Sequence, residues 1–168
     1  ANTTGTQHVA VGYGAAGTVT TGNSLTAIGF QALKANTTGG DNCAIGENTL
    51  YTNTTGANNT GVGSCLRTNL DGSNNSALGK DALTSNTSGA SNVAVGYQAL
   101  DANTTASDNV AVGTSSLGAN IDGEQNVAMG SGALSGLTGG DYNTCIGYAA
   151  GDACTTGSGN VLIGHNND

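Results

Sequence analysis

Four cysteines, two histidines and several aspartates are the residues of this chain whose types could bind a metal ion or take part in catalysis. The cysteines, Cys43, Cys65, Cys145 and Cys154, show no CxxC spacing, and His8 and His165 lie near the two ends of the chain. A zinc site needs such ligands grouped at short spacings, so zinc binding is not expected. Cys145 and Cys154 are nine residues apart, and the sequence leaves open a disulfide between them or a pair of buried thiols.

Asp41, Asp108 and Asp141 suggest calcium, because aspartates in the turns of some β-rolls bind this ion. They do not recur in consecutive copies of the repeat described below, so isolated surface carboxylates are the preferred interpretation. No nucleophile can be paired with a general base, and no glycine-rich run opens a helix. We therefore expect neither enzymatic activity nor a bound cofactor.

The elements that must position these residues follow a short repeat. A glycine preceded by an aliphatic residue recurs at regular spacing in ten copies, and eight of the nine intervals are 17 residues long while one is 16. These glycines are Gly12, Gly29, Gly46, Gly63, Gly79, Gly96, Gly113, Gly130, Gly147 and Gly164. A fixed period of this length predicts a solenoid in which each copy forms one coil. We predict a single all-β domain over residues 1–168, a parallel β-solenoid of about ten coils.

Two columns of the repeat keep their residue type along the chain. The residue before each repeat glycine forms an apolar column: Val11, Ile28, Ile45, Val62, Leu78, Val95, Val112, Met129, Ile146 and Ile163. Asparagine stands four residues before the glycine in eight copies: Asn42, Asn59, Asn75, Asn92, Asn109, Asn126, Asn143 and Asn160. Strand alternation places the asparagine, a small residue and the glycine on one face and the aliphatic residue on the other. We predict one short strand per copy and an asparagine ladder, each amide bonding the amides above and below it.

A second apolar column and a polar turn complete the repeat. Leucine recurs after the glycine at Leu33, Leu50, Leu83, Leu100, Leu117 and Leu134. An Asn-Thr-Thr-Gly stretch such as 36–39 follows, and Asn and Gly suit the left-handed backbone of a tight corner. One residue is missing between Gly63 and Leu66, yet the pattern recovers at once, so we expect a corner to absorb the deletion without a change of strand register.

The number of apolar columns indicates self-association. One thin coil has little room for both apolar columns together with the alanines and asparagines. An aliphatic stripe left uncovered would be roughly 40 Å long, so a partner is expected to cover it. We therefore predict a homo-oligomer, and a trimer in particular.

The composition narrows the classes of molecule that the chain could bind. Three basic residues against eleven acidic ones give a formal charge of −8, which disfavours nucleic acid. No apolar run is long enough to span a membrane. Asn, Thr, Ser and Gly supply most of the polarity, which suits hydrated extracellular material, a cell-surface glycan or another receptor.

The strings 92–96 (Asn-Val-Ala-Val-Gly) and 109–113 (Asn-Val-Ala-Val-Gly) resemble the repeated core of trimeric autotransporter adhesin heads, and also repeats in fibre proteins of tailed phages and large viruses. The resemblance implies a left-handed parallel β-roll, three of which associate about a long axis, and a role in attachment. The autotransporter repeat is typically shorter than this one, and no stalk heptads or membrane anchor accompany it here. A viral or other extracellular fibre therefore fits better than a complete autotransporter.

The expected function is thus a non-enzymatic structural and adhesive module of a fibre at an extracellular, cell or virion surface. The alternative is a filament subunit that stacks head to tail, because the first and last copies are ordinary and present open strand edges. Ice binding through Thr37, Thr54, Thr87 and Thr104 is the least favoured, because Leu70 and Ile121 interrupt that column.

Overall fold

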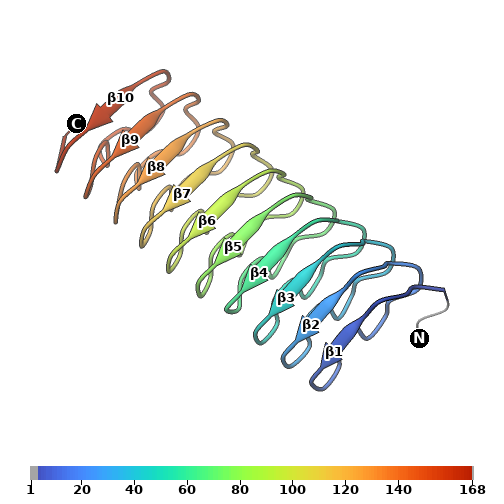
Figure 1. Cartoon of the computed structure of the whole chain (residues 1–168). Coiled ribbons are helices and arrows are strands. Elements are labelled where there is room, and N and C mark those ends of the chain that lie inside the picture. The colour runs from blue at the N-terminus through green and yellow to red at the C-terminus, as the bar shows by residue number, and fades with distance from the viewer. Residues whose placement is uncertain (1–3, 168) are drawn as a thin grey trace.

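The computed structural model describes residues 4–167, which form ten short parallel strands in one continuous sheet, paired in chain order. Figure 1 shows a single stack with the two termini at opposite ends. The strands are β1 (Val9–Val11), β2 (Thr26–Ile28), β3 (Cys43–Ile45), β4 (Thr60–Val62), β5 (Ser76–Leu78), β6 (Val93–Val95), β7 (Val110–Val112), β8 (Val127–Met129), β9 (Thr144–Ile146) and β10 (Val161–Ile163). The predicted all-β parallel solenoid is confirmed, with about nine coils joining the ten strands.

The described residues contain no helix long and apolar enough to cross a membrane.

Each strand pairs with the next through the same positions of the repeat. Across the 16-residue interval, Thr60 of β4 lies opposite Ser76 of β5, and Val62 lies opposite Leu78. These positions correspond to those paired between all the other neighbouring strands, so the missing residue shifts no register. The prediction that a corner absorbs the deletion is confirmed.

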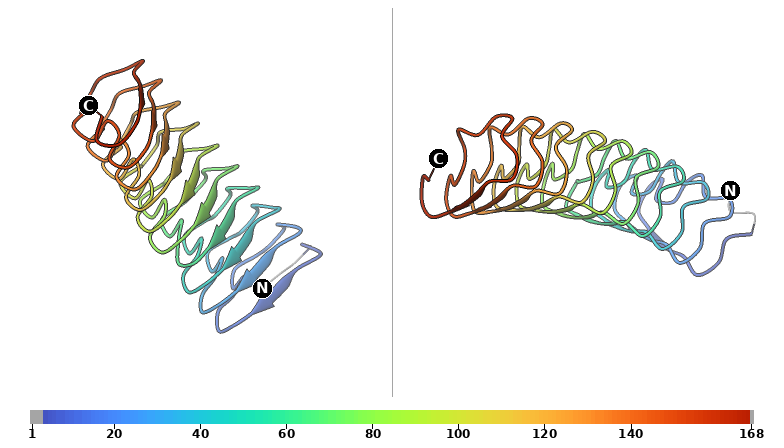
Figure 2. Two further views of the ribbon diagram at one scale, coloured as in Figure 1. Left: turned by 60° about the vertical axis from the view of Figure 1, so that its left-hand side comes forward. Right: turned by 90° about the horizontal axis from the view of Figure 1, so that it is seen from above.

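Leucine and alanine fill the inside of the coil. The leucine column is fully buried at Leu33, Leu50, Leu66, Leu83, Leu100, Leu117 and Leu134, as are the strand alanines Ala27, Ala44, Ala94, Ala111 and Ala128. Figure 2 shows that the coil stays narrow along the whole rod, which curves gently. Small side chains suffice to close-pack so thin an interior.

The left-handed backbone conformation lies at other positions than the sequence predicted. The asparagines that begin the Asn-Thr-Thr-Gly turns do not have positive φ angles. Positive φ occurs instead at the second residue after the repeat glycine, at the buried leucine and just before the ladder asparagine, as at Gln31 (55°), Leu33 (50°) and Asp41 (55°). Each such residue costs about 1 kcal/mol of backbone energy, so the stacking of coils overrides local preference at these three corners.

Candidate functional site

The outward face of the sheet carries a line of exposed, large apolar side chains. The residue before each repeat glycine points away from the interior, because its neighbour in the strand points inward and is buried. In a single chain, Val11 is 57% exposed, Leu78 50% and Met129 43%. The coil therefore encloses the leucine column and leaves the aliphatic column outside. In the single chain the aliphatic column is therefore open to solvent.

A second outward column runs beside the first, two residues earlier in each strand. It consists of Val9, Thr26, Cys43, Thr60, Ser76, Val93, Val110, Val127, Thr144 and Val161. Neither column contains a charged residue. Strands about 4.8 Å apart make the two columns a strip roughly 43 Å long. We call these two columns the apolar strip; the second column also carries hydroxyl groups at Thr26, Thr60, Ser76 and Thr144.

The asparagines predicted to form a ladder are aligned along the inside of the rod, but their hydrogen bonds differ from a simple amide ladder. Asn42 Oδ1 accepts the backbone N–H of Asn59 at 2.9 Å, and Asn42 Nδ2 donates to the carbonyl of Gly56 at 2.7 Å. The same pair of bonds recurs along the stack, and a few pairs add a direct amide bond, such as Asn92 Nδ2 to Asn75 Oδ1 at 3.2 Å. Each side chain thus satisfies backbone groups of the next coil, which is a structural role.

A direct amide ladder does exist, but it belongs to another set of asparagines. Asn69 Nδ2 donates to Asn53 Oδ1 at 2.7 Å, and Asn86 Nδ2 donates to Asn69 Oδ1 at 2.7 Å. The set, here called the corner ladder, is Asn36, Asn53, Asn69, Asn86, Asn103 and Asn120, all fully buried. Asn36 and Asn53 begin Asn-Thr-Thr-Gly stretches, which the sequence predicted only as turns, and the other four begin related stretches such as Asn-Leu-Asp-Gly at 69–72. Their regular spacing was the available signal, but spacing does not reveal that the side chains point inward.

Hydroxyl groups replace the hydrogen bonds that the missing residue removes. In the other coils, the second residue after the repeat glycine donates its backbone N–H to the preceding coil, as Asp81 does to the Ser64 carbonyl at 3.2 Å. After Gly63 this donor is absent, and Ser64 Oγ donates to the Glu47 carbonyl at 2.7 Å instead. The N–H of Ser64 in turn is accepted by Thr49 Oγ1 at 3.2 Å. Two side-chain hydroxyls thus bond the short coil to the coil before it where the backbone donor is missing.

The interior of the short coil is adjusted as well. Gly61 stands where most strands have alanine, and a Cβ added there would lie 2.6 Å from Thr49 Cγ2 and 3.1 Å from Cys65 Sγ. Burial raises the pKa of the Cys65 thiol to about 12, so the sulfur is a neutral packing group. Thr49 and Cys65 thus fill the space that an alanine methyl occupies in other strands.

We expect Gly61→Ala to lower the free energy of unfolding by about 1–3 kcal/mol, because the added methyl overpacks the interior. Thr49→Ser removes the clashing Cγ2 and keeps the hydroxyl that accepts the Ser64 N–H. Combined with Gly61→Ala, it should recover at least half of the loss, as measured by urea unfolding followed by circular dichroism. A double variant no more stable than Gly61→Ala alone would show that Thr49 is not the source of the clash.

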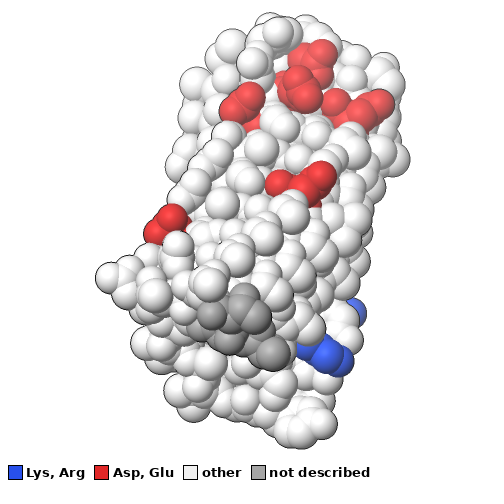
Figure 3. All heavy atoms as spheres, turned by 90° about the vertical axis from the view of Figure 1, so that its right-hand side faces the viewer, with Lys and Arg blue, Asp and Glu red and all other residues white. Residues whose placement is uncertain are grey.

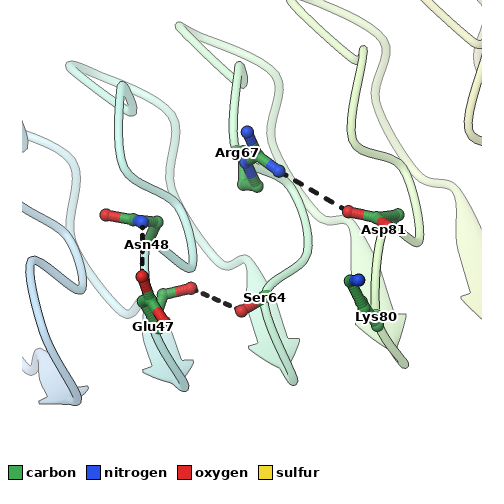
Figure 4. Close-up of a pocket in the computed structure, with 6 residues that line it drawn as sticks. All are labelled: Glu47, Asn48, Ser64, Arg67, Lys80 and Asp81. Atoms are coloured by element: carbon green, nitrogen blue, oxygen red, sulfur yellow. Dashed lines mark hydrogen bonds and ion pairs between the residues drawn. The ribbon is translucent and has the colours of Figure 1, made fainter.

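A hollow of about 330 Å³ opens on the surface over the short coil, lined by Glu47, Asn48, Ser64, Arg67, Lys80 and Asp81. Figure 4 shows the polar contacts of the lining: Arg67 Nη1 lies 3.5 Å from Asp81 Oδ1, Asn48 Nδ2 donates to Glu47 Oε1 at 3.3 Å, and Ser64 Oγ donates to the Glu47 carbonyl. Arg67 and Lys80 are two of the three basic residues of the chain. Most of the face seen in Figure 3 is uncharged, and its carboxylates lie apart from the Lys and Arg atoms. The hollow is suited to binding a polar, charged group.

The remaining residues considered for chemistry are dispersed. Within the described chain all four cysteines are free, so Cys145 and Cys154 are a pair of thiols. Burial is the main cause that raises the pKa of Cys145, and the neighbouring Cys154 raises it further. His165 stacks on Tyr148 with ring centroids 5.1 Å apart, and His8 is half-buried in the first coil. Over residues 4–167 no three His, Cys, Asp or Glu side chains are grouped as metal ligands; Asp41, Asp108 and Asp141 belong to different coils.

Comparison with protein-family models, with curated proteins and with solved structures gives no match to this chain. The class that the fold defines is the parallel β-solenoid with an asparagine-bonded interior, a structural repeat module. The resemblance to adhesin heads and fibre repeats rests on the repeat motif.

Proposed function

We propose that the chain is a structural module of an extracellular or virion fibre, which associates with copies of itself through the apolar strip and presents its polar corners for attachment. The observation that carries this proposal is the strip itself. The coil has a complete interior of its own, so the exposed aliphatic column is not needed to close it. A charge-free line of large apolar side chains outside a finished core is best explained by a partner surface.

The shape of the molecule supports a fibre. Each coil bonds to the next through strand pairing, through the ladder asparagines and through the corner ladder, so the stack resists bending at every step. Such a rod offers length and rigidity rather than an enclosed pocket. These are the properties needed to hold an attachment surface away from a cell or a virion.

A closed trimer suits the strip. Identical rods carry identical strips. Rotational symmetry lets every strip face a common axis, so that no strip stays exposed to solvent. Three is also the number of chains that the resemblance to adhesin heads implies. The polar corners on the other sides of each coil then form the outer surface of the fibre.

Val95→Asp tests the proposal at the centre of the strip. Val95 is half-buried in a single chain, and its side chain lies on the face opposite the buried Ala94, so the coil should fold with its circular dichroism spectrum unchanged. In the assembly, the same carboxylate would be buried without a partner, which is strongly unfavourable. We expect sedimentation velocity to show the unmodified chain as a trimer and Val95→Asp as a monomer at about 10 µM, since such a penalty weakens association more than a hundredfold.

Thr105→Asp provides the matched control. Thr105 is exposed in the Asn-Thr-Thr turn, and Asp71 and Asp122 occupy the equivalent position in other coils. This variant adds the same charge away from the strip and should sediment like the unmodified chain. Equal sedimentation of the Val95 and Thr105 variants would show that the strip is not the interface.

A further inference from the structure

The hollow over the short coil is a consequence of the missing residue. One residue fewer after Gly63 draws that corner inward, while the coils on either side keep their full length. Asn48 and Asp81, from those two coils, stand at the sides of the hollow, and Ser64 lies between them (Figure 4). The 16-residue interval is single among the nine, so we expect the hollow at one fixed height along the rod.

The charges around the hollow leave one cation without a partner. Asp81 pairs with Arg67, and no described carboxylate forms an ion pair with Lys80. Lys80 is exposed, and its ammonium group can therefore take an external carboxylate. Arg67 reaches Asp81 through Nη1 alone, at 3.5 Å, which leaves further guanidinium N–H groups free to donate.

The other lining groups define the rest of the ligand. Glu47 and Asp81 can accept hydrogen bonds, and the Asn48 amide can both donate and accept them. All three are typical partners of paired hydroxyl groups. The two carboxylates disfavour a compact dianion such as phosphate, because all of its charge would lie inside the hollow. The lining thus matches a group with one carboxylate and several hydroxyls.

We infer that the hollow binds an acidic saccharide, with the ring carboxylate on Lys80 and Arg67 and the ring hydroxyls on Glu47, Asn48 and Asp81. This inference names a ligand class for the attachment role proposed above and rests on that role. A volume of about 330 Å³ is at the small end of ligand sites and suits one sugar ring.

Aromatic side chains extend the site along the rod. Each coil has one residue directly after its repeat glycine, and in this column Phe30 precedes Glu47 while Tyr97 follows Lys80. Both rings are 47% exposed. They are four coil steps apart, roughly 19 Å, so a short oligosaccharide held at the hollow can also lie against a ring. Three hollows in a trimer would add the avidity that weak saccharide contacts require.

The test titrates the unmodified chain with tri-galacturonate and, separately, with its methyl ester, which has the same rings without the charges. Backbone amide chemical shifts of the ¹⁵N-labelled protein at low salt report the affinity. We expect tri-galacturonate to shift the amides of Ser64 and Asp81 and to bind about tenfold more tightly than the ester, because one charge-assisted contact has this effect. Inorganic phosphate and glycine, titrated in the same way, should bind at least about tenfold more weakly than tri-galacturonate.

Two lysine variants separate a local site from a general effect of charge. Lys80→Gln should weaken tri-galacturonate binding about tenfold. Lys34→Gln removes the same charge from a lysine whose Nζ bonds Tyr51 OH at 3.3 Å, outside the hollow, and should change the affinity less than about twofold.

Three results would overturn the inference. The first is that tri-galacturonate shows no saturable binding. The second is that its ester, phosphate or glycine binds as tightly as tri-galacturonate, and the third is that the two lysine variants weaken binding equally. Each is distinct from a failure of the proposed fibre role, because association through the apolar strip is measured by sedimentation without any saccharide.

Discussion

Asn86→Asp is expected to destabilise the rod by more than about 3 kcal/mol at pH 7, because it places an unpaired charge in the corner ladder. Asn86 is fully buried, and its Nδ2 donates to Asn69 Oδ1 at 2.7 Å and to the Gly89 carbonyl at 3.0 Å. An aspartate would present a carboxylate oxygen to both of these acceptors. Two hydrogen bonds would become two repulsions inside a packed interior.

The pH dependence of this variant identifies the cause. Burial beside two acceptors raises the pKa of the introduced carboxyl above its unfolded value of about 3.9. The penalty is therefore complete above the raised pKa and vanishes below about pH 3.9, where both states are protonated and the carboxyl can donate. Urea unfolding at pH 7 and pH 3 should show a large difference from the unmodified chain at pH 7 and a small one at pH 3.

Asn74→Asp is the control for Asn86→Asp. Asn74 is exposed just before a ladder asparagine, where Asp41 and Asp108 stand in other coils. Its replacement should change the free energy of unfolding by less than about 0.5 kcal/mol at either pH. A loss at Asn86 that is no larger than this, or that persists at pH 3, would contradict the role assigned to the corner ladder.

Leu100→Ala is expected to lower the free energy of unfolding by about 2–5 kcal/mol, because it opens a cavity in the middle of the leucine column. Leu100 is fully buried and has a φ of 53°, a conformation held only by the coils around it. Coils contact only their neighbours, so the damage should be local. Hydrogen exchange should accelerate most in the coils next to Leu100 and least in the first and last coils.

Leu70→Ala separates burial from residue type. Leu70 is 46% exposed, so its truncation leaves no cavity and should cost less than about 1 kcal/mol. If truncation at Leu70 cost as much as at Leu100, the leucine column would not be the core of the rod.

The features that recur in every copy could be predicted from the sequence. The period fixed the solenoid, and alternation in strands such as Val93–Val95 predicted which side chains point inward. The recovery of the pattern after Gly63 predicted that the register is kept, as the pairing of Thr60 with Ser76 shows. Repetition makes such inferences strong, because ten copies must satisfy one geometry.

The features that depend on the direction of single side chains could not be predicted. Asn69 and its equivalents look like turn residues, since polarity and spacing do not tell an inward amide from an exposed one. The left-handed conformation of Leu33 opposes the local preference of leucine and is imposed by stacking. The bond from Ser64 Oγ to the Glu47 carbonyl, and the hollow beside it, arise from a deletion whose local geometry no repeat specifies.

Native mass spectrometry of the unmodified chain at about 10 µM tests the central claim most directly. Association through the apolar strip predicts a species of about 49 kDa, three chains of 16.2 kDa each. A stable species of 16.2 kDa alone would show that the strip stays exposed to solvent and would contradict the proposed fibre module.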